Sequence, residues 1–464
     1  MNVTRIAKGL LQVSALGVSS CSGTPSVSSH IDGGISAGGT SGGTVDTSST
    51  IGAGGFPAIG GSVASGGVAT TNSDSSTGGT GVDAGDAVSP TLSLLHASGG
   101  YIVDSAGNKV LLRGVNLGGW LVMEKWMCPL DSGTLPDTYS VVQVLDSRFG
   151  IATEQQLLAT YQQNWITADD LDNIKNGGYN VVRVPVWWGN FYPINDISNA
   201  GWRSDSFAIL DWLVNQAGAR GLYVIIDMHG AVGGQSTADH TGQQNSNLYW
   251  SDSNNQGNTG WMWWQIANHF AGNPTVAGYD LLNEPMGAPS TNDVWNAYAN
   301  LYDSIRSADP DHIIIIEGTF GNWNWDVLPG PTVFNWTNVV YEMHEYQWNG
   351  TSAQIKAGSD NQVSDFKNHS TWNVPGFIGE FNDFDSGTDT WRYSIDAYEN
   401  AGLSWTMWSY KAATGTSPTS WGWFYPVGSP SVPDIQNDSA DTIAAAWRQW
   451  RTGAAFTINS AIGM

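Results

Sequence analysis

The stretch Ala277-Gly278-Tyr279-Asp280-Leu281-Leu282-Asn283-Glu284-Pro285 guides how the rest of the chain is interpreted. Its apolar residues predict a short buried strand that ends in a polar pair and a proline. The carboxyl of Glu284 cannot join the apolar core that Leu281 and Leu282 indicate, so we expect it at the mouth of the strand. Such a carboxyl is a candidate for acid or base chemistry, although a lone glutamate at a strand end is also an ordinary surface residue.

A second stretch about a hundred residues later has the same design. Gly376-Phe377-Ile378-Gly379-Glu380-Phe381 is again a short apolar strand that ends in a glutamate. Two carboxyl groups at strand ends are what a two-carboxylate mechanism requires. The pair therefore favours a catalytic interpretation of Glu284 over a structural one.

Outward from these two stretches, short apolar segments rich in β-branched residues alternate with amphipathic segments. The predicted strands are 111–116, 180–186, 222–228, 276–283, 313–317, 339–344, 376–380 and 404–408; predicted helices include 207–219, 261–270, 295–307 and 390–401. This alternation implies parallel strands with helical crossovers. Eight such units predict an α/β fold, a (β/α)8 TIM barrel with long βα loops. A doubly wound open sheet is the alternative, but no glycine-rich phosphate motif follows the first strand.

Ahead of the barrel, residues 101–110 predict a β-hairpin that closes the underside of the barrel. Catalytic residues of such barrels lie at the C-terminal ends of strands. Polar residues are found at seven of the eight predicted ends: Asn116, Arg183, Asp227 with His229, Asn283 with Glu284, Glu317, His344 with Tyr346, and Glu380. The eighth end holds Trp408.

Several motifs resemble glycoside hydrolase family 5, the cellulase-like retaining barrels. They are Arg113-Gly114-Val115-Asn116-Leu117-Gly118-Gly119-Trp120-Leu121, Val182-Arg183-Val184-Pro185, Asp227-Met228-His229-Gly230, Leu282-Asn283-Glu284-Pro285, His344-Glu345-Tyr346 and Ile378-Gly379-Glu380-Phe381. The resemblance covers about residues 94 to 450. The opening segment 118–126 is similar to the exo-β-1,3-glucanase branch, and so is His229-Gly230-Ala231-Val232-Gly233-Gly234-Gln235.

The resemblance implies a role for each matching residue. Glu284 would be the general acid/base and Glu380 the nucleophile. Arg183, His229, Asn283, His344 and Tyr346 would surround them, Trp408 would be the platform under the sugar, and Glu124 would bind hydroxyls of the non-reducing-end sugar. We expect Arg183 and Tyr346 to lower the pKa of Glu380, and apolar surroundings to raise that of Glu284.

The function that follows is that of a retaining glycoside hydrolase that cleaves β-glucosidic bonds of a polysaccharide, a β-1,3-glucanase-like enzyme with exo action. The alternatives are an endo-β-1,4-glucanase, a mannanase, a glycolipid glycosidase, a transglycosylase of the same fold and a carbohydrate-binding barrel without catalysis. Such chemistry implies no cofactor and no metal. The expected partner is a polysaccharide or oligosaccharide, and we expect a monomer.

Composition is consistent with a carbohydrate ligand. The net charge of −24 comes from 17 basic against 41 acidic residues, which argues against a nucleic-acid groove. The 24 tryptophans suit both a large core and a cleft that stacks sugar rings. We expect Trp323, Trp325 and Trp348 in cleft subsites, the tryptophans of 261–264 in the core, and Cys128 as a small packed residue.

The N-terminus predicts export. Residues 1–21 combine Arg5 and Lys8 with a short apolar run, which is typical of a signal peptide. Val18-Ser19-Ser20-Cys21 resembles a bacterial lipobox, in which Cys21 carries a lipid anchor; an ordinary cleaved signal fits the same residues. Residues 22–90 are rich in Gly, Ser and Thr and predict a disordered linker, followed by a catalytic domain at 91–464. The expected location is secreted or cell-surface.

One local match is rejected on its spacing. Residues 252–257 begin like a calcium-binding loop, but the position of the bidentate glutamate holds Trp263.

Overall fold

The computed structural model describes residues 92–462 apart from 132, 199–200, 322 and 418. The predicted signal peptide, Cys21 and the whole of the predicted linker lie outside the described residues. Among the described residues, no helix combines the length and apolar character needed to cross a bilayer.

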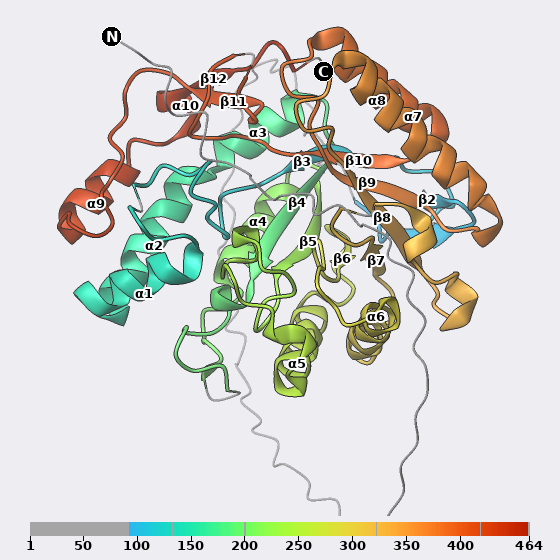
Figure 1. Cartoon of the computed structure of the whole chain (residues 1–464), viewed down its shortest axis with the longest axis horizontal. Helices are drawn as coiled ribbons and strands as arrows, with labels where there is room; N and C mark the ends of the chain where they lie inside the picture. The colour runs from blue at the N-terminus through green and yellow to red at the C-terminus, as the bar shows by residue number, and fades with distance from the viewer. Residues whose placement is uncertain (1–91, 132, 199–200, 322, 418, 463–464) are drawn as a thin grey trace, which may run out of the picture. The chain divides into compact units, whose positions relative to one another are not determined.

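Eight parallel strands close into a barrel in the order β10-β3-β4-β5-β6-β7-β8-β9 (Figure 1). The predicted (β/α)8 fold is therefore confirmed. The strands are β3 (Arg113–Asn116), β4 (Val181–Trp187), β5 (Tyr223–Gly230), β6 (Val276–Asp280), β7 (Ile313–Glu317), β8 (Val339–Glu345), β9 (Gly376–Phe381) and β10 (Ser404–Met407). Each of the eight lies within two residues of its predicted start, and β6 ends three residues earlier than predicted.

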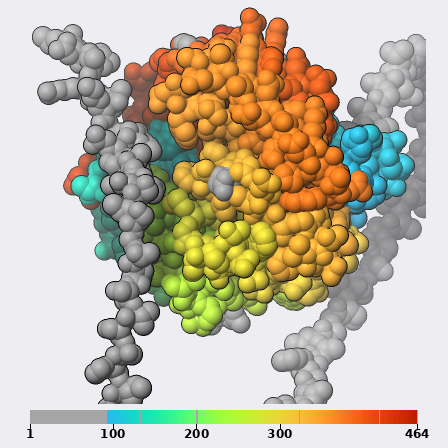
Figure 2. Space-filling model, turned by 45° about the vertical axis from the view of Figure 1, so that its right-hand side comes forward, coloured from blue at the N-terminus to red at the C-terminus, as the bar shows by residue number. Residues whose placement is uncertain are grey.

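Helices cover the outside of the barrel, with α1 and α2 on one side and α7 and α8 on the other (Figure 1). They are α1 (Thr138–Phe149), α2 (Ile151–Trp165), α3 (Ala168–Asn176), α4 (Ala208–Gly218), α5 (Ser253–Phe270), α6 (Thr291–Arg306), α7 (Ser352–Asn368), α8 (Thr388–Ala401), α9 (Ala440–Trp447) and α10 (Thr452–Ala455). In the space-filling view, yellow and orange segments from the second half of the chain form one continuous surface (Figure 2).

Short 3-10 helices occur in the loops: η1 (Trp188–Asn190), η3 (Asp239–Thr241), η4 (Leu248–Trp250), η5 (Trp325–Val327), η6 (Pro331–Val333) and η7 (Ser370–Trp372). Helix α5 begins eight residues before the predicted start at 261, because the Asp252 side chain accepts a hydrogen bond from the Asn254 amide and caps the helix. This cap accounts for the calcium-like start of the segment.

A hairpin closes the N-terminal end of the barrel. Its turn lies at residues 99–100, ahead of the hairpin predicted at 101–110. Strand β1 (His96–Ser98) pairs with β2 (Tyr101–Val103), and the predicted second arm is reduced to a bridge between Val103 and Lys109. Ile102 from β2 packs in one apolar cluster with residues of the barrel strands, including Val181 and Phe377. The barrel floor is thus a packed layer, and the chemistry is confined to the opposite end.

The C-terminal segment adds a two-stranded sheet that the sequence analysis did not predict. Strand β11 (Phe424–Pro426) pairs with β12 (Phe456–Ile458). Beside it the rings of Trp447 and Trp165 are both buried, and the buried Lys411 ammonium lies 4.4 Å from the centre of the Trp165 ring. Cys128 is buried, as expected of a packed residue.

Candidate active site

Glu284 stands in a strained turn just after β6. Leu281 and Leu282 before it are fully buried, while the backbone of Glu284 takes a positive φ of 44°. A left-handed conformation is uncommon for a residue with a side chain and persists where surrounding contacts hold it. Here the Glu284 amide donates to Glu317 Oε2 at 2.9 Å. The turn directs the carboxyl of Glu284 away from the core and toward other strand ends.

Glu380 belongs to β9 and is held by two donors. The Tyr346 hydroxyl donates to its Oε2 at 2.8 Å, and Arg183 Nη1 donates to its Oε1 at 2.9 Å. The glycine before it is required, since a Cβ on Gly379 would lie 1.3 Å from Glu342 Oε1. Gly379 therefore leaves room for the Glu342 side chain inside the barrel. The next residue, Glu380, presents its carboxyl at the barrel mouth.

His344 brings the two glutamates together. Its Nδ1 lies 2.8 Å from Glu284 Oε1 and 3.6 Å from Glu380 Oε2. The two carboxyl oxygens are consequently no farther apart than the sum of these two distances. Both glutamates are only 5% exposed, so each carboxyl is almost removed from water.

Arg183 is a fully buried cation that links several strand ends. It donates to four side-chain oxygens at 2.9 to 3.0 Å: Asn116 Oδ1, Asp280 Oδ2, Asn283 Oδ1 and Glu380 Oε1. Asp227 Oδ2 lies 3.2 Å away. The guanidinium thus compensates the charge of Glu380 directly, but it makes no ion pair with Glu284 among the described residues.

The surroundings give the two glutamates different pKa values. Burial, the charge of Glu380 and the charge of Glu124 raise the pKa of Glu284 well above its usual value. Burial also raises the pKa of Glu380, but the charge of Arg183 and the Tyr346 hydrogen bond oppose that rise. Arg183 and Tyr346 therefore act on Glu380 in the expected direction, but burial outweighs them and the net shift of its pKa is upward. The pKa of Glu284 is raised further, well above its usual value.

The three histidines of the site are neutral. Burial lowers the pKa of His229 to about 4 and that of His240 to about 3, and it lowers the pKa of His344 well below the usual value. His229 Nδ1 lies 2.7 Å from Asp227 Oδ2. Its ring stacks on the Trp408 ring at 5.4 Å and 10°. This contact fixes the predicted platform against β5.

Asn283 and Glu124 complete the set predicted from the sequence. The amide Nδ2 of Asn283 is buried and has no hydrogen-bond partner among the described residues, while its Oδ1 accepts from Arg183. Glu124 accepts a hydrogen bond from Trp126 Nε1 at 2.7 Å. Burial and the charge of Asp239 raise the pKa of Glu124 to about 8. All nine predicted site residues therefore lie at the C-terminal end of the barrel.

Sequence reasoning missed His240 and left Glu317 without a role. His240 lies in η3, inside the long loop 231–252, and its Nε2 is 3.5 Å from Glu284 Oε2. No local pattern indicates that this loop folds back over Glu284. Glu317 is the last residue of β7 and was among the predicted strand ends, but no role followed from its sequence position.

An aromatic wall borders the site, formed by Trp126, Tyr346, Trp348, Phe384 and Trp421. Trp348 is 57% exposed and stacks on Tyr346 at 5.2 Å and 25°. Its ring also lies 5.3 Å from that of Trp421, which in turn lies 4.9 Å from Trp126. Flat exposed rings beside a polar pocket suit the apolar faces of sugars.

The three tryptophans predicted to line subsites lie in different environments in the structure. Trp348 belongs to the aromatic wall, and Trp323 is partly buried with its ring 5.7 Å from that of His344. Trp325 is a correction: it is 3% exposed and packs on Tyr341 and Phe366, away from the carboxyls.

One group of side chains could hold a metal ion. Glu284, Glu317 and His344 can each offer one atom, all within 4.8 Å of one another. His344 Nδ1 and Glu284 Oε1 already form a hydrogen bond with each other, so these two atoms have a partner without a metal ion. We therefore assign the group to proton positioning.

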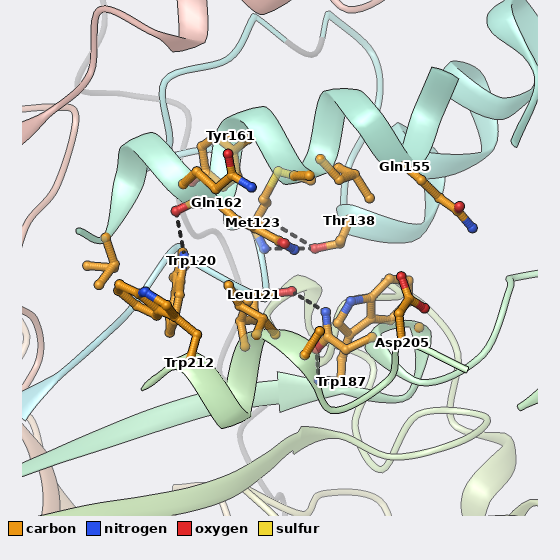
Figure 3. A pocket seen from close by; sticks show the side chains of 18 of the residues that line it. Trp120, Leu121, Met123, Thr138, Gln155, Tyr161, Gln162, Trp187, Asp205 and Trp212 are labelled. Atoms are coloured by element: carbon orange, nitrogen blue, oxygen red, sulfur yellow. Dashed lines mark hydrogen bonds between the residues drawn. The ribbon is translucent and has the colours of Figure 1, made fainter. Parts of the chain in front are cut away.

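A separate cavity of about 650 Å³ lies between α1, α2 and α4 (Figure 3). Its walls include Trp120, Trp187, Trp212 and Gln162. Neither Glu284 nor Glu380 lines it, so this cavity is not the catalytic site.

Known proteins resemble this chain in sequence and in fold. The family model of cellulase, glycosyl hydrolase family 5, matches residues 145–414. Relatives include a β-xylosidase of Phanerodontia chrysosporium, 26% identical over 69% of this chain and 71% of that protein. Glucan 1,3-β-glucosidase I/II of Saccharomyces cerevisiae is 29% identical over 58% of this chain and 63% of its own length.

A probable glucan 1,3-β-glucosidase A of Aspergillus niger is 29% identical over 51% of this chain. The alignment spans 56% of that relative, so only about half of it is matched. Among solved structures, rutinosidase from Aspergillus niger superposes with a TM-score of 0.54 at 19% identity, over 67% of this chain and 93% of that one. An endogalactoceramidase superposes with a TM-score of 0.53 at 19% identity, over 77% and 85%. At these identities the superpositions show the fold.

Proposed function

The chain belongs to glycosyl hydrolase family 5 and is a glycosidase, and we propose that it cleaves β-glucosidic bonds by a retaining double displacement. The observation that carries the proposal is the placement of both glutamates on one imidazole, His344 Nδ1. The resulting upper limit on the separation of these two oxygens is compatible with the roughly 5–5.5 Å between the carboxyl groups of retaining enzymes.

In the first step a Glu380 oxygen attacks the anomeric carbon as the bond to the leaving oxygen breaks. Glu284 donates its proton to that oxygen, and a covalent glycosyl-enzyme forms. In the second step Glu284, now ionised, takes a proton from water. The water oxygen attacks the anomeric carbon, the bond to Glu380 breaks, and Glu284 is protonated again.

The surrounding side chains favour an ionised Glu380 and a protonated Glu284, as the first step requires. Arg183 and Tyr346 both donate to Glu380, which stabilises its carboxylate. Among the residues that the structure describes, Glu284 has no cation within ion-pair distance, because His344 and His240 beside it are neutral. Ionisation of both carboxyls in this buried site would bring two like charges together, so the proton stays on Glu284.

Two further residues suit the transition state. Asn283 has a free buried N–H donor, which is suited to the sugar 2-hydroxyl, a contact that strengthens as positive charge develops at the anomeric carbon. Trp408 is buried against His229 and offers a rigid face beneath the sugar. Both contacts would act on the sugar at the cleavage point.

We propose β-glucan as the substrate, with exo action. Two relatives carry the name glucan 1,3-β-glucosidase. Glu124, which is 8% exposed, contributes to the electrostatics of both catalytic glutamates, so it lies near enough to bind sugar hydroxyls at the closed end of a pocket. A β-xyloside is the second candidate, favoured by the β-xylosidase relative that aligns over 69% of this chain.

Glu380→Gln tests the mechanism. We expect the purified variant to lose at least about a thousandfold in kcat on an aryl β-glucoside, because the amide cannot form the glycosyl-enzyme. Glu284→Gln should retain more activity on a substrate with an acidic phenol leaving group than on a glucan, since that leaving group needs little protonation. Near-normal turnover by Glu380→Gln would refute the assignment.

A panel of laminarin, cellulose, mannan, mixed-linkage glucan and xylo-oligosaccharides tests the substrate. Glucose as the sole product from laminarin would support exo action on β-1,3-glucan. A ladder of oligomers, or turnover only of another polymer, would refute it. Binding of these polymers without turnover would instead support a non-catalytic barrel.

We also propose that the protein is exported and carries a lipid on Cys21. The support is the order of basic residues, apolar run and cysteine in residues 1–21. Cys21→Ser should release the protein from the membrane fraction into the soluble fraction of the expressing bacterium. Unchanged fractionation would refute the anchor.

A further inference from the structure

The cavity between α1, α2 and α4 is lined by side chains that the proposed mechanism does not use. Its volume of about 650 Å³ lies within the range of roughly 300–1,000 Å³ that is usual for small-molecule pockets. Met123 lines this cavity, whereas the next residue, Glu124, lies close enough to Glu284 to affect its pKa. The segment that carries both residues therefore separates the cavity from the catalytic carboxyls, and a ligand in the cavity is bound but not cleaved.

One wall of the cavity is a single face of α2. Gln155, Leu158, Ala159 and Gln162 recur at intervals of three or four positions, which places them on one side of a helix (Figure 3). The side-chain amides of Gln155 and Gln162 are half-buried and form no hydrogen bond with any residue that the structure describes. Each amide therefore offers two donor hydrogens and an acceptor oxygen to an occupant of the cavity.

The opposite wall carries a braced aromatic ring, that of Trp212 from α4. The half-buried Trp212 ring meets the buried Trp120 ring edge-on, with their centres 6.0 Å apart. Trp120 is in turn tied to α2, because its Nε1 donates to the Gln162 carbonyl at 2.9 Å. Trp120 thus fixes the aromatic side of the cavity relative to the helix that bears the free amides.

A small recess of about 20 Å³ adjoins the cavity and shares four lining residues with it, among them Gln155 and Arg203. A space of this size holds about one water-sized group. The Tyr192 hydroxyl lines the recess, is fully buried and has no hydrogen-bond partner within the described part of the chain. Glu154 lines it too, is 5% exposed and forms neither a hydrogen bond nor an ion pair with the described residues. The recess thus presents two polar groups that an occupant can satisfy.

These groups favour a neutral ligand that is rich in hydroxyls. An apolar occupant would leave the free amides and the Tyr192 hydroxyl buried without partners, which is unfavourable. An anion would meet the Glu154 carboxyl, while Arg203 is already paired with Asp205 at 3.0 Å. A cation would meet Arg203 at the entrance of the recess. A sugar fits all of these groups, since its hydroxyls both donate and accept and its ring faces are apolar.

We propose that this cavity is a second carbohydrate site, which holds a short stretch of the polysaccharide apart from the catalytic carboxyls. A sugar ring would lie on Trp212, its hydroxyls would bond Gln155 and Gln162, and one hydroxyl would enter the recess at Tyr192. The identity of the sugar rests on the function proposed above. A polymer bound here stays beside the catalytic site between cleavages, whereas a small glycoside gains nothing from it.

The first experiment measures binding of laminaritriose, and separately of xylotriose, by isothermal titration calorimetry. The protein is the full chain with Glu380→Gln, so that the sugar is not cleaved. We expect two binding sites for at least one of the two sugars. Adding Gln155→Ala together with Gln162→Ala should weaken one site at least about tenfold, since each lost hydrogen bond is worth about fivefold.

Gln156→Ala is the matched control, because Gln156 is exposed on the same helix and does not line the cavity. This control should bind as its parent does. All three changes place alanine, a good helix former, on a helix surface, so we expect the variants to fold. A single site in the parent, or two undiminished sites in the double variant, would overturn the proposal.

The second experiment compares a polymer with a small substrate in the chain with an intact Glu380. Gln155→Ala with Gln162→Ala should raise KM for laminarin or xylan at least about threefold more than KM for the matching aryl β-glycoside. Equal changes in both KM values would overturn the proposal. Failure of the proposed function has a different signature, which is no turnover of either substrate by the wild type; loss of trisaccharide binding in the double variant would then still support the second site.

Discussion

Replacing Tyr346 by phenylalanine isolates the hydrogen bond that holds the nucleophile ionised. The change removes one hydroxyl and keeps the ring that stacks on Trp348. The lost contact is the 2.8 Å donation from Tyr346 to Glu380 Oε2. Arg183 still donates to the other oxygen, so Glu380 keeps one of its two direct donors.

The size of the effect follows from the type of bond. A hydrogen bond to a charged group contributes about 1.5–3 kcal/mol, so we expect kcat/KM on an aryl β-glucoside to fall roughly 10- to 150-fold. Burial already raises the pKa of Glu380, and the Tyr346 bond is one of the contributions that oppose it. Without that bond the pKa rises further, so the nucleophile is protonated, and activity is lost, at a higher pH than in the wild type.

The assay is the pH dependence of kcat/KM with an aryl β-glucoside. Tyr346→Phe should move the acidic limb of the profile upward. Tyr341→Phe is the matched control, because that buried hydroxyl bonds the Pro329 carbonyl and no carboxyl. If the acidic limb of Tyr346→Phe coincides with that of the control, the hydrogen bond does not set the charge of Glu380.

Three further outcomes are expected. Asn283→Ala should lower kcat on a glucoside by about 100-fold but should have a much smaller effect on a 2-deoxyglucoside, and equal losses on both would contradict the contact with the 2-hydroxyl. Trp348→Ala should raise KM for a glucan several-fold more than KM for an aryl glucoside, while the midpoint of urea unfolding stays unchanged; an equal change in both KM values would contradict a subsite there. Burial would raise the pKa of Asp309, but hydrogen bonds from His312 and the backbone lower it to about 2, so its contribution to stability is full above pH 4 and is lost as the pH falls toward 2. Asp309→Ala should therefore lower the free energy of unfolding by about 2–4 kcal/mol at pH 7 and by less at pH 3, as measured by urea unfolding at both values, and an equal loss at both would refute the assignment.

The barrel strands could be predicted because their sequence pattern is local. Each is a short run of buried aliphatic residues with a polar residue at its C-terminal end, as in Ile313–Glu317, where the predicted and observed bounds coincide. Burial on both sides of a parallel strand produces that continuous apolar run. The two catalytic candidates were recognisable for the same reason, since a glutamate that ends such a run is conspicuous.

The features that could not be predicted from the sequence depend on contacts between distant segments of the chain. His240 approaches Glu284 only because the loop 231–252 folds across the barrel mouth, and no periodicity in that loop encodes the path. Trp325 and Trp348 both lie in loops rich in polar residues, yet one is 3% and the other 57% exposed. Local composition cannot indicate which ring turns inward when the burying partners, such as Phe366, lie 41 positions away along the chain. The lowering effect of Arg183 and Tyr346 on the pKa of Glu380 was predictable, but the larger opposing effect of burial was not, because the depth of burial is a property of the closed barrel.

The guanidinium at the centre of the barrel also links activity to the order of folding. Its hydrogen-bond partners are Asn116, Asp280, Asn283 and Glu380, which lie 67, 97, 100 and 197 positions from it in the sequence. Such long-range contacts form late, because closing large loops costs entropy before the contacts compensate for it. Helices should therefore appear during refolding well before turnover does. During refolding, the delay between recovery of the helical circular dichroism signal and recovery of activity would measure how long the last strand pair takes to close.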